Sequence, residues 1–549
     1  MLSTLKDYLP SSTLILLMII AYILYSYLTS TFDFWLDLGV PFHKPWPLFG
    51  NFANLLLFQK SQVEGISEMY NWFTNERFGG LIRVRSPMLM LRDPDLIKAV
   101  CVKDFTVFRN RGIPVNNTSD PLSGHLFNLE GDQWKNLRAK LTPAFSSGKL
   151  KNMFYLLSEC SSNLENLIER KLIHLHPSLS STNTQIPTNN GIANGISNTN
   201  SECQEIEVRE LATNFTIDVI GSCAFGLQIN ALTGDECEFK IVAKKLSKPS
   251  YKSALWRMLR VSLPSLYKAL GVQVIDASVT NFFLDVVSQM IKQRGKSSTK
   301  RHDFMDLLIE LKNKGTLETH DTGDREKQEE ESEKIVMDDQ TIAAQAFVFF
   351  VAGFETSSNT IAFCLYELAV NPEIQEKVRD ELTEALNEHD GELTYDAIQN
   401  MKYLDLVILE TLRKYPPAPM LSRRCEIPYK IPGSDVELPK GMRVIIPIYA
   451  IQHDSEHYPE PELFKPERFN EENKRTRHPY TFLPFGEGPR SCIGVRFALL
   501  QTKVGVITFL KKYRVDVCEK TDLPIKFSRR SLVTASETGI WLKISRLER

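Results

Sequence analysis

The sequence lacks closely spaced cysteine pairs, a large net charge and a nucleotide-binding glycine motif. Its 9 cysteines are odd in number and scattered, with no Cys-x-x-Cys pair, so neither a disulfide framework nor a zinc site is indicated and a reducing compartment is favoured. The net charge of −2 gives no reason to expect a nucleic-acid partner. Without a Gly-x-Gly-x-x-Gly fingerprint or a recognisable flavin domain, the chain is not expected to bind nicotinamide itself.

No long linker divides the chain into comparable parts, although 549 residues would by length alone suggest several domains. We therefore expect one large catalytic domain over residues 52–549. Two stretches inside it are predicted to be flexible surface segments. Residues 178–201 are rich in Ser, Thr and Asn, and residues 314–339 are rich in charge, and neither composition supplies enough apolar surface to order itself.

The N-terminal residues 1–32 are predicted to be a membrane anchor. No charged residue lies between Tyr8 and Phe32, and this run is long enough to cross a bilayer. A cleaved secretory signal is the competing interpretation, but Lys6 is offset by Asp7 and no small-residue cleavage site stands out. Residues 33–51 follow as a proline-rich hinge, and the three prolines within residues 39–51 exclude regular helix there.

Beyond the hinge, the pattern predicts a mixture of helices and a small sheet. Short apolar runs at 81–84 and 88–91 are strand candidates. Residues 109–127 read as a loop because Gly, Pro, Asn and Ser are frequent there. Helices are expected at 210–227 and 402–414.

The most specific pattern lies at residues 484–494, Pro-Phe-Gly-Glu-Gly-Pro-Arg-Ser-Cys-Ile-Gly, directly before an apolar helical run. At a helix start, Cys492 would see the positive end of the helix dipole and unpaired N–H groups, which favour the thiolate. Gly488 and Gly494 allow close backbone approach to a flat group. Arg490 adds a cation suited to a carboxylate. A buried structural cysteine in a Gly/Pro turn is the alternative.

This Phe-x-x-Gly-x-Arg-x-Cys-x-Gly pattern resembles the haem-binding loop of the cytochrome P-450 haem-thiolate monooxygenases. The resemblance implies a mainly α fold with a smaller β region, preceded by a single N-terminal transmembrane helix. It implies haem b as cofactor, with Cys492 as the axial metal ligand. Phe485, Gly488, Arg490 and Gly494 would then be cofactor-binding residues.

Further arginines match positions that hold haem propionates in this family. Trp134 and Arg138 lie four residues apart, and therefore on one face of a predicted helix. They resemble the family pair that grips a propionate, for which a guanidinium fork is well suited. Arg423 resembles a further propionate ligand by position, although its neighbour Arg424 leaves that assignment open.

A strongly apolar helix is predicted at 339–371, interrupted by Ala-Gly-Phe-Glu-Thr-Ser-Ser. A helix that is apolar all round is expected to be buried. The Thr356 hydroxyl could bond to the carbonyl of Ala352 and open the helix, and Gly353 could let a planar ligand approach. In the family, the pair equivalent to Glu355 and Thr356 delivers protons to bound oxygen. The alternative is a core helix with a satisfied threonine and a surface-leaning glutamate.

Glu410 and Arg413 lie three residues apart on a predicted helix, and Arg468 follows in a Pro-Glu-Arg-Phe segment. Most such pairs are surface ion pairs of little energy. Together the three resemble the family's buried Glu-Arg-Arg triad, which implies a structural role in fixing the segment that leads to Cys492.

Residues that would line a substrate cavity follow from the same resemblance and from their apolar character. They are Val115, Phe127, Phe350, Phe354, Met420, Leu421 and Val533.

The resemblance implies a monooxygenase that uses O2 and receives electrons from NADPH through a separate reductase, with cytochrome b5 as a possible second donor. Lys135, Arg138 and Arg496 are candidate reductase contacts. The insect microsomal branch of the family implies a lipophilic xenobiotic substrate at the cytosolic face of the endoplasmic reticulum membrane. Hormone or fatty-acid oxidation is the alternative for the substrate. The alternative functions are an oxygen-independent isomerase or dehydratase of the same fold, a haem-thiolate gas sensor, and a membrane-anchored scaffold that has lost its haem.

Overall fold

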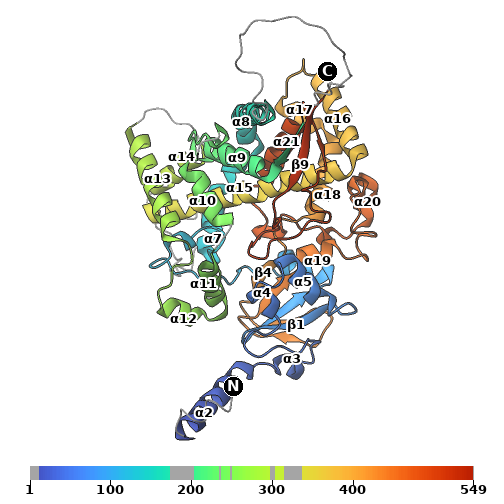
Figure 1. The fold of residues 1–549 in the computed structure, drawn as a ribbon. Coiled ribbons are helices and arrows are strands. Elements are labelled where there is room, and N and C mark those ends of the chain that lie inside the picture. Colours follow the sequence, from blue (N-terminus) through green and yellow to red (C-terminus); the bar gives the residue numbers. More distant parts are fainter. Residues whose placement is uncertain are drawn as a thin grey trace, which may run out of the picture.

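The computed structural model describes residues 11–173, 203–233, 236–247, 250–296, 303–313 and 337–547, and most of them are helical (Figure 1). The helices are α2 (Ser11–Thr29), α3 (Phe34–Asp37), α4 (Ala53–Leu56), α5 (Gln62–Asn71), α6 (Pro94–Lys98), α7 (Gly131–Leu141), α8 (Ser147–Ile173), α9 (Val208–Ile220), α10 (Glu238–Ser247), α11 (Tyr251–Ser262), α12 (Pro264–Ala269), α13 (Ala277–Lys296), α14 (Phe304–Asn313), α15 (Asp339–Val370), α16 (Pro372–Asn387), α17 (Tyr395–Asn400), α18 (Lys402–Lys414), α19 (Ile448–Gln452), α20 (Glu471–Thr476) and α21 (Val495–Leu510).

The strands form small sheets at separate places in the molecule. One sheet has the order β1-β2-β7-β4, with β2 and β7 parallel and the other neighbours antiparallel. A second has the order β3-β9-β8 and pairs a middle segment with the C-terminal strands. The strands are β1 (Phe78–Arg83), β2 (Ser86–Leu91), β3 (Cys203–Glu207), β4 (Leu421–Arg424), β5 (Tyr429–Lys430), β6 (Glu437–Leu438), β7 (Arg443–Ile446), β8 (Tyr513–Asp516) and β9 (Trp541–Arg546).

The mainly α fold with a smaller β region is confirmed. The strand candidates at 81–84 and 88–91 appear as β1 and β2, and the helix expected at 402–414 is α18. Val84 is not part of the strand, because it lies in the tight turn to β2 with a φ of 59°. The predicted segment 178–201 lies outside the described residues. The same holds for 314–336, while Asp338 already caps the start of α15 through the amide of Thr341.

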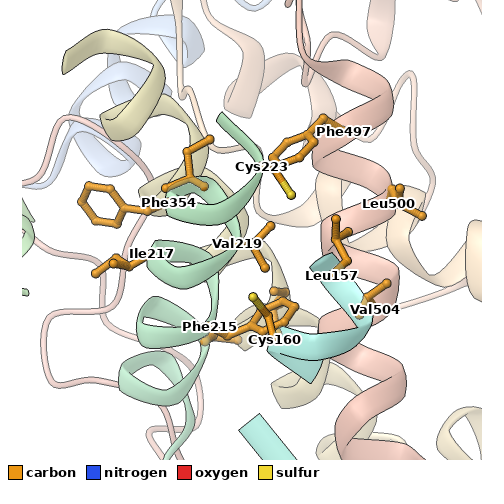
Figure 2. Packing of buried hydrophobic residues seen from close by; sticks show 14 of the residues in the cluster. Leu157, Cys160, Phe215, Ile217, Val219, Cys223, Phe354, Phe497, Leu500 and Val504 are labelled. Carbon is orange, nitrogen blue, oxygen red and sulfur yellow. The ribbon is translucent and has the colours of Figure 1, made fainter. Parts of the chain in front are cut away.

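Helix α15 runs through the middle of the helical region and contacts α9, α13, α18 and α21. Figure 2 shows how α8, α9 and α21 pack side by side, with Leu157, Val219 and Leu500 among the facing side chains. All three are almost completely buried, and burying each such side chain contributes about 1.5–3 kcal/mol. The helix that follows Cys492 is therefore held in place by the main core.

Helix α2 has an apolar surface that the rest of the described chain does not cover. The segment Ser12–Asp37 is long and apolar enough to cross a membrane, and none of its most apolar 18-residue window is buried. Helix α2 projects away from the β1 sheet in Figure 1. The other helix of this kind, α15, is mostly buried in the core. At the junction, the Arg85 guanidinium stacks 3.6 Å from the centre of the Tyr27 ring. Residues 11–29 are thus a candidate membrane span.

The proline-rich segment 33–51 is packed onto the β1 sheet and is not a free spacer. Trp35 is completely buried and donates its indole N–H to the carbonyl of Leu81 at 2.9 Å. The Asn51 side chain accepts the amide of Ile82 at 2.7 Å. These contacts hold the segment after α2 against the sheet that contains β1.

Candidate active site

Cys492 lies in a loop that ends at the start of α21. The loop contains the short helical turn η8 (Gly488–Arg490), and Gly494 is the N-cap of α21. The amide of Cys492 donates to the carbonyl of Phe485 at 2.8 Å, while the Cys492 sulfur accepts the backbone N–H of Gly494. The loop therefore folds back on itself and fixes the direction of the sulfur.

The Cys492 side chain lines a cavity of about 490 Å³. Arg138 from α7, Phe145 from the turn after α7 and Arg496 from α21 share this cavity. Phe145 stacks on Phe349 of α15 at a ring-centre distance of 5.3 Å. The structure therefore brings Arg138 and Cys492, which are far apart in the sequence, to one cavity.

Two glycines of the loop serve different purposes. Gly488 has a φ of 73°, and a Cβ there would collide with the carbonyl oxygen of Cys101, so the loop can only take this path with glycine. A Cβ at Gly494 would meet nothing closer than the Phe145 ring at 4.0 Å. The backbone at Gly494 thus presents a bare surface next to Cys492.

Desolvation by the surrounding protein dominates the acidity of the Cys492 thiol, although the side chain is open to the cavity. This desolvation raises the pKa of Cys492 above its usual value, while the N–H of Gly494 and the charges of Arg138 and Arg111 act in the opposite direction. The N–H group at the helix start therefore acts in favour of the thiolate, as expected from the sequence, but desolvation outweighs it. A bound metal ion would remove the proton, because coordinating thiols are deprotonated.

Arginines from distant parts of the chain converge beside this loop: Arg111, Arg138, Arg423 and Arg490. The Arg490 guanidinium lies 3.9 Å from the centre of the Trp134 ring and donates to the carbonyls of Arg109 and Leu129. Burial and the neighbouring Arg423 lower the pKa of Arg490 to about 9. Such a group of like charges requires anionic partners.

The structure distinguishes Arg423 from Arg424. Arg424 is already paired with Glu130 at 2.6 Å and with Glu426 at 3.0 Å. Arg423 is 1% exposed, and its buried Nε has no hydrogen-bond partner in the described part of the chain. Arg423 is therefore the residue of the two with hydrogen-bonding capacity left for a ligand.

The residues present fit a haem with its two propionates. Buried donors of Arg111, Arg423 and Arg490 have no partner among the described residues, and leaving buried donors unpaired costs free energy that a carboxylate would recover. Cys492 supplies the sulfur ligand on the cavity wall. The donor set thus combines a thiol for iron with several guanidinium groups for carboxylates.

Helix α15 is continuous from Asp339 to Val370, so the predicted interruption is absent. The Thr356 hydroxyl donates to the carbonyl of Ala352 at 2.7 Å, as expected, without opening the helix. Gly353 does not face a planar ligand, because a Cβ there would meet the Ile220 side chain of α9 at 2.7 Å. Its role in this structure is close helix packing.

Glu355 is buried beside Thr356, contrary to the interpretation of a surface-leaning carboxylate. Burial raises the pKa of Glu355 to about 7, while Arg209, a hydrogen bond from Ser247 and Arg257 oppose the rise. A carboxyl group with this pKa can both hold and release a proton near neutral pH. The pair is therefore suited to proton transfer.

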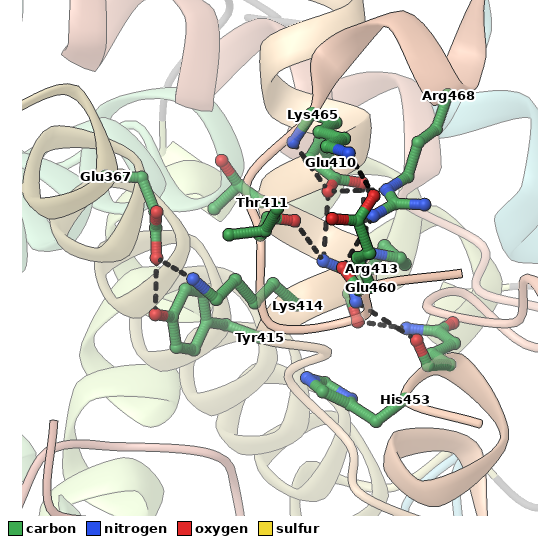
Figure 3. Close-up of polar contacts among 12 residues, drawn as sticks. Glu367, Glu410, Thr411, Arg413, Lys414, Tyr415, His453, Glu460, Lys465 and Arg468 are labelled. Atoms are coloured by element: carbon green, nitrogen blue, oxygen red, sulfur yellow. Dashed lines mark hydrogen bonds and ion pairs between the residues drawn. The ribbon is translucent and has the colours of Figure 1, made fainter. Parts of the chain in front are cut away.

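The Glu410, Arg413 and Arg468 residues form a buried ion-pair cluster, which Figure 3 shows. Glu410 and Arg413 are 0% exposed and are joined by two hydrogen bonds of 2.9 Å. Arg468 lies 3.3 Å from the Glu410 carboxylate, and Glu410 also accepts the amide of Lys465 at 3.0 Å. The carboxylate thus connects α18 to the segment that precedes the Cys492 loop.

The residues predicted to line a cavity lie in different environments. Phe350 and Phe354 are completely buried, and Phe350 packs against Phe239 of α10 and Phe283 of α13. Phe127 is 45% exposed under the Arg111 guanidinium. Val115, Met420, Leu421 and Val533 are half-buried. In the middle of α15, the accessible apolar side chains are Val348, Val351 and Ala352.

Sequence reasoning missed Arg111 and Phe145. Arg111 donates to the carbonyls of Phe127 and Arg490, and so connects the 109–127 loop to the Cys492 loop. The sequence offered one hint of this role, because Arg111 lies in the 109–127 loop, which also contains the cavity candidates Val115 and Phe127. Phe145 carried no signal, because its place in the cavity depends on the packing of α15.

Comparison with known proteins agrees with this geometry. The family model described as Cytochrome P450 matches residues 40–175 and 192–542. The chain is 36% identical over 538 residues to "Probable cytochrome P450 6a14" of Drosophila melanogaster, which covers 97% of this chain and 99% of the relative. It is 38% identical to "Cytochrome P450 6a2" of the same organism, with 94% and 96% covered.

A cockroach relative gives the same picture. "Cytochrome P450 9e2" of Blattella germanica is 36% identical over 524 residues, which cover 95% of both chains. Haem, iron and oxygen chemistry belong to this family, and its members are monooxygenases. The chain is a member of the cytochrome P450 family of oxidoreductases.

Proposed function

We propose that this chain inserts one oxygen atom of O2 into a lipophilic small molecule, by hydroxylation or epoxidation. The observation that carries the proposal is the accessible Cys492 sulfur on the wall of a cavity shared with Arg138. Similarity to insect relatives named cytochrome P450 supports xenobiotic metabolism, including plant toxins and insecticides. Oxidation of an endogenous hormone or fatty acid is the second candidate.

Cys492 would ligate the haem iron through its sulfur, and Arg111, Arg138, Arg423 and Arg490 would hold the propionates. When bound, the haem supplies the activation of O2, and thiolate ligation favours cleavage of the O–O bond. The protein contributes the fixed direction of the sulfur. This direction is set by the backbone hydrogen bonds that Cys492 makes with Phe485 and Gly494.

Glu355 and Thr356 would hold and pass on the protons that the reaction consumes. Glu355 is buried, with a pKa raised to about 7 chiefly by that burial, so it can take up a proton and pass it on. The Thr356 hydroxyl donates to Ala352 at 2.7 Å, which leaves its oxygen free to accept a further hydrogen bond. The side chains of Val348 and Val351 on the same helix would keep the substrate side apolar.

Electrons would come from NADPH through a separate reductase, with cytochrome b5 as a possible second donor. Lys135 and Arg496 are exposed and Arg138 is half-buried, and Arg138 and Arg496 border the cavity that contains Cys492. A reductase with an acidic surface would dock here. The candidate span in α2 supports attachment to the endoplasmic reticulum membrane, with the catalytic domain on the cytosolic face.

The proposal is tested with the full-length, haem-loaded protein reconstituted with a microsomal reductase in lipid. We expect NADPH-dependent oxidation across a panel of lipophilic compounds and a thiolate-type spectrum of the reduced carbon monoxide complex. A thiolate-type spectrum without turnover would indicate a gas sensor, and would refute the monooxygenase proposal. Product formation without O2 would instead indicate an isomerase or dehydratase.

A further inference from the structure

The tip of the hairpin between β1 and β2 contacts the end of the candidate membrane span in α2. The Arg85 guanidinium lies 3.6 Å from the centre of the Tyr27 ring and donates to the hydroxyl of Ser30 at 3.1 Å. Tyr27 is two residues before the end of α2 at Thr29, which is roughly 3 Å along the helix axis. The hairpin tip therefore lies level with the end of α2.

The length of α2 places this end at the surface of a bilayer. Its 19 residues measure about 28 Å at the rise of an α-helix, close to the hydrocarbon thickness of about 30 Å. Nearby, Trp46 and Leu48 are 68% and 47% exposed, and tryptophan is enriched at the membrane–water interface. Their segment adjoins the hairpin, because Gly50 forms backbone bridges with both Trp46 and Arg83. The hairpin tip is thus at the depth of the lipid headgroups.

The two arginines of the hairpin have donors left unpaired. Arg83 and Arg85 are half-buried. Within the described ranges, the ion pairs of this region involve Arg77 and Arg92 but neither Arg83 nor Arg85. The buried Nε and Nη2 of Arg83 and the buried Nε of Arg85 have no hydrogen-bond partner there either. The anion that such cations require is therefore not among the described residues.

Arg83 remains a cation at neutral pH. Burial, followed by the charge of Arg443, lowers the pKa of Arg83 to about 9. Its guanidinium lies 5.6 Å from the centre of the Phe52 ring, which is a weak partner compared with an anion. A negatively charged group at this place would remove the cost of leaving the charge uncompensated.

The backbone between the two arginines is strained. Val84 has a φ of 59°, a conformation that β-branched residues rarely adopt. Val84 is 5% exposed, and its amide donates to the carbonyl of Phe49 at 3.3 Å. Strained conformations persist where the surrounding structure fixes them, and they occur at ligand-binding sites. The tip therefore holds the backbones of both arginines in fixed positions beside α2.

We propose that Arg83 and Arg85 bind the headgroup phosphates of anionic phospholipids in the bilayer that α2 enters. This inference goes beyond oxygen insertion and rests on the proposed membrane attachment. Guanidinium groups form charge-assisted hydrogen bonds to phosphate oxygens, and anionic lipids belong to the cytoplasmic leaflet. Exposed Trp46 and Leu48 would contact the adjoining acyl chains. The bound lipid would thereby fix the angle between α2 and the catalytic domain.

The test compares a short-chain phosphatidic acid with the diacylglycerol of the same acyl chains, which lacks the phosphate. Each lipid is titrated onto the full-length, haem-loaded protein in detergent micelles, and the lipid-bound fraction is measured by native mass spectrometry. We expect the phosphatidic acid to bind about 10- to 100-fold more tightly, as for charge-assisted hydrogen bonds. In the R83Q/R85Q double variant, the ratio of the two dissociation constants should fall to about one.

Matched variants separate this site from a general effect of charge. K474Q/R475Q removes two exposed charges from α20, which lies far from α2 in Figure 1, and should keep the full ratio. R83K/R85K keeps both charges and should keep part of it. Equal binding of the two lipids by the unmodified protein would overturn the inference, as would an unchanged ratio in R83Q/R85Q.

A single substitution keeps the test decisive if the double variant does not fold. Arg85→Gln changes only the turn position of the hairpin, and it should lower the ratio several-fold; an unchanged ratio would also overturn the inference. Failure of the proposed oxidation looks different, because NADPH-dependent turnover would be absent while the lipid ratio persists. Failure of the membrane attachment would show as extraction of the full-length protein from vesicles by alkaline carbonate.

Discussion

Replacing Glu410 by glutamine should strongly destabilise the protein. Glu410 and Arg413 are 0% exposed, and the carboxylate also lies 3.3 Å from Arg468. The substitution keeps the side-chain volume but leaves two arginines without their shared counter-ion. Removing one partner of a buried ion pair costs about 3–5 kcal/mol. We expect this loss in the free energy of unfolding, measured by urea titration and far-ultraviolet circular dichroism.

Glu467 provides the matched control. It lies one residue before Arg468 and is 54% exposed, and its ion pair with Lys377 is 3.7 Å long. Glu467→Gln should therefore change the free energy of unfolding by no more than about 0.5 kcal/mol. The reasoning is refuted if Glu410→Gln costs less than about 1 kcal/mol, or no more than the control.

Three further substitutions test the site. Arg423→Gln should lower haem retention during gel filtration more than Arg424→Gln does, because Arg424 is already paired with Glu130 and Glu426; equal retention would contradict the assignment. Gly488→Ala should prevent the loop from forming, since its Cβ would collide with the carbonyl of Cys101, and a normal carbon monoxide spectrum would refute this. Glu355→Gln should remove a pH dependence of stability. Because the pKa of Glu355 rises from 4.5 to about 7 on folding, the native state takes up a proton between these values and loses roughly 3 kcal/mol of stability as the pH rises through them. Parallel stability–pH curves for both proteins would contradict it.

Local sequence patterns were sufficient where the chemistry is built from neighbouring residues. The Cys492 loop and the helix after it could be predicted because glycine spacing, a cysteine and an apolar run occur in one continuous stretch. Helix α18 carries Glu410 and Arg413 at a spacing that already places them together. Their burial with Arg468, in contrast, required the tertiary structure to establish.

The orientation of residues within a helix could not be predicted when the helix is apolar on all sides. In α15 the sequence does not show whether Phe350 or Val351 is accessible, because both are apolar and the neighbouring helices decide. Gly353 illustrates the same limit, since its neighbour Ile220 lies more than a hundred residues earlier. The convergence of Arg111 and Arg423 likewise depends on the folding of distant segments.

The central claim is that Cys492 is the haem-iron ligand. The most direct measurement is the reduced carbon monoxide difference spectrum of the full-length protein, compared with those of Cys492→His and Cys101→Ala. Cys101 is a completely buried cysteine next to the same loop. We predict a thiolate-type spectrum for the unmodified protein and Cys101→Ala, and its loss in Cys492→His. A thiolate-type spectrum that persists in Cys492→His would contradict the account.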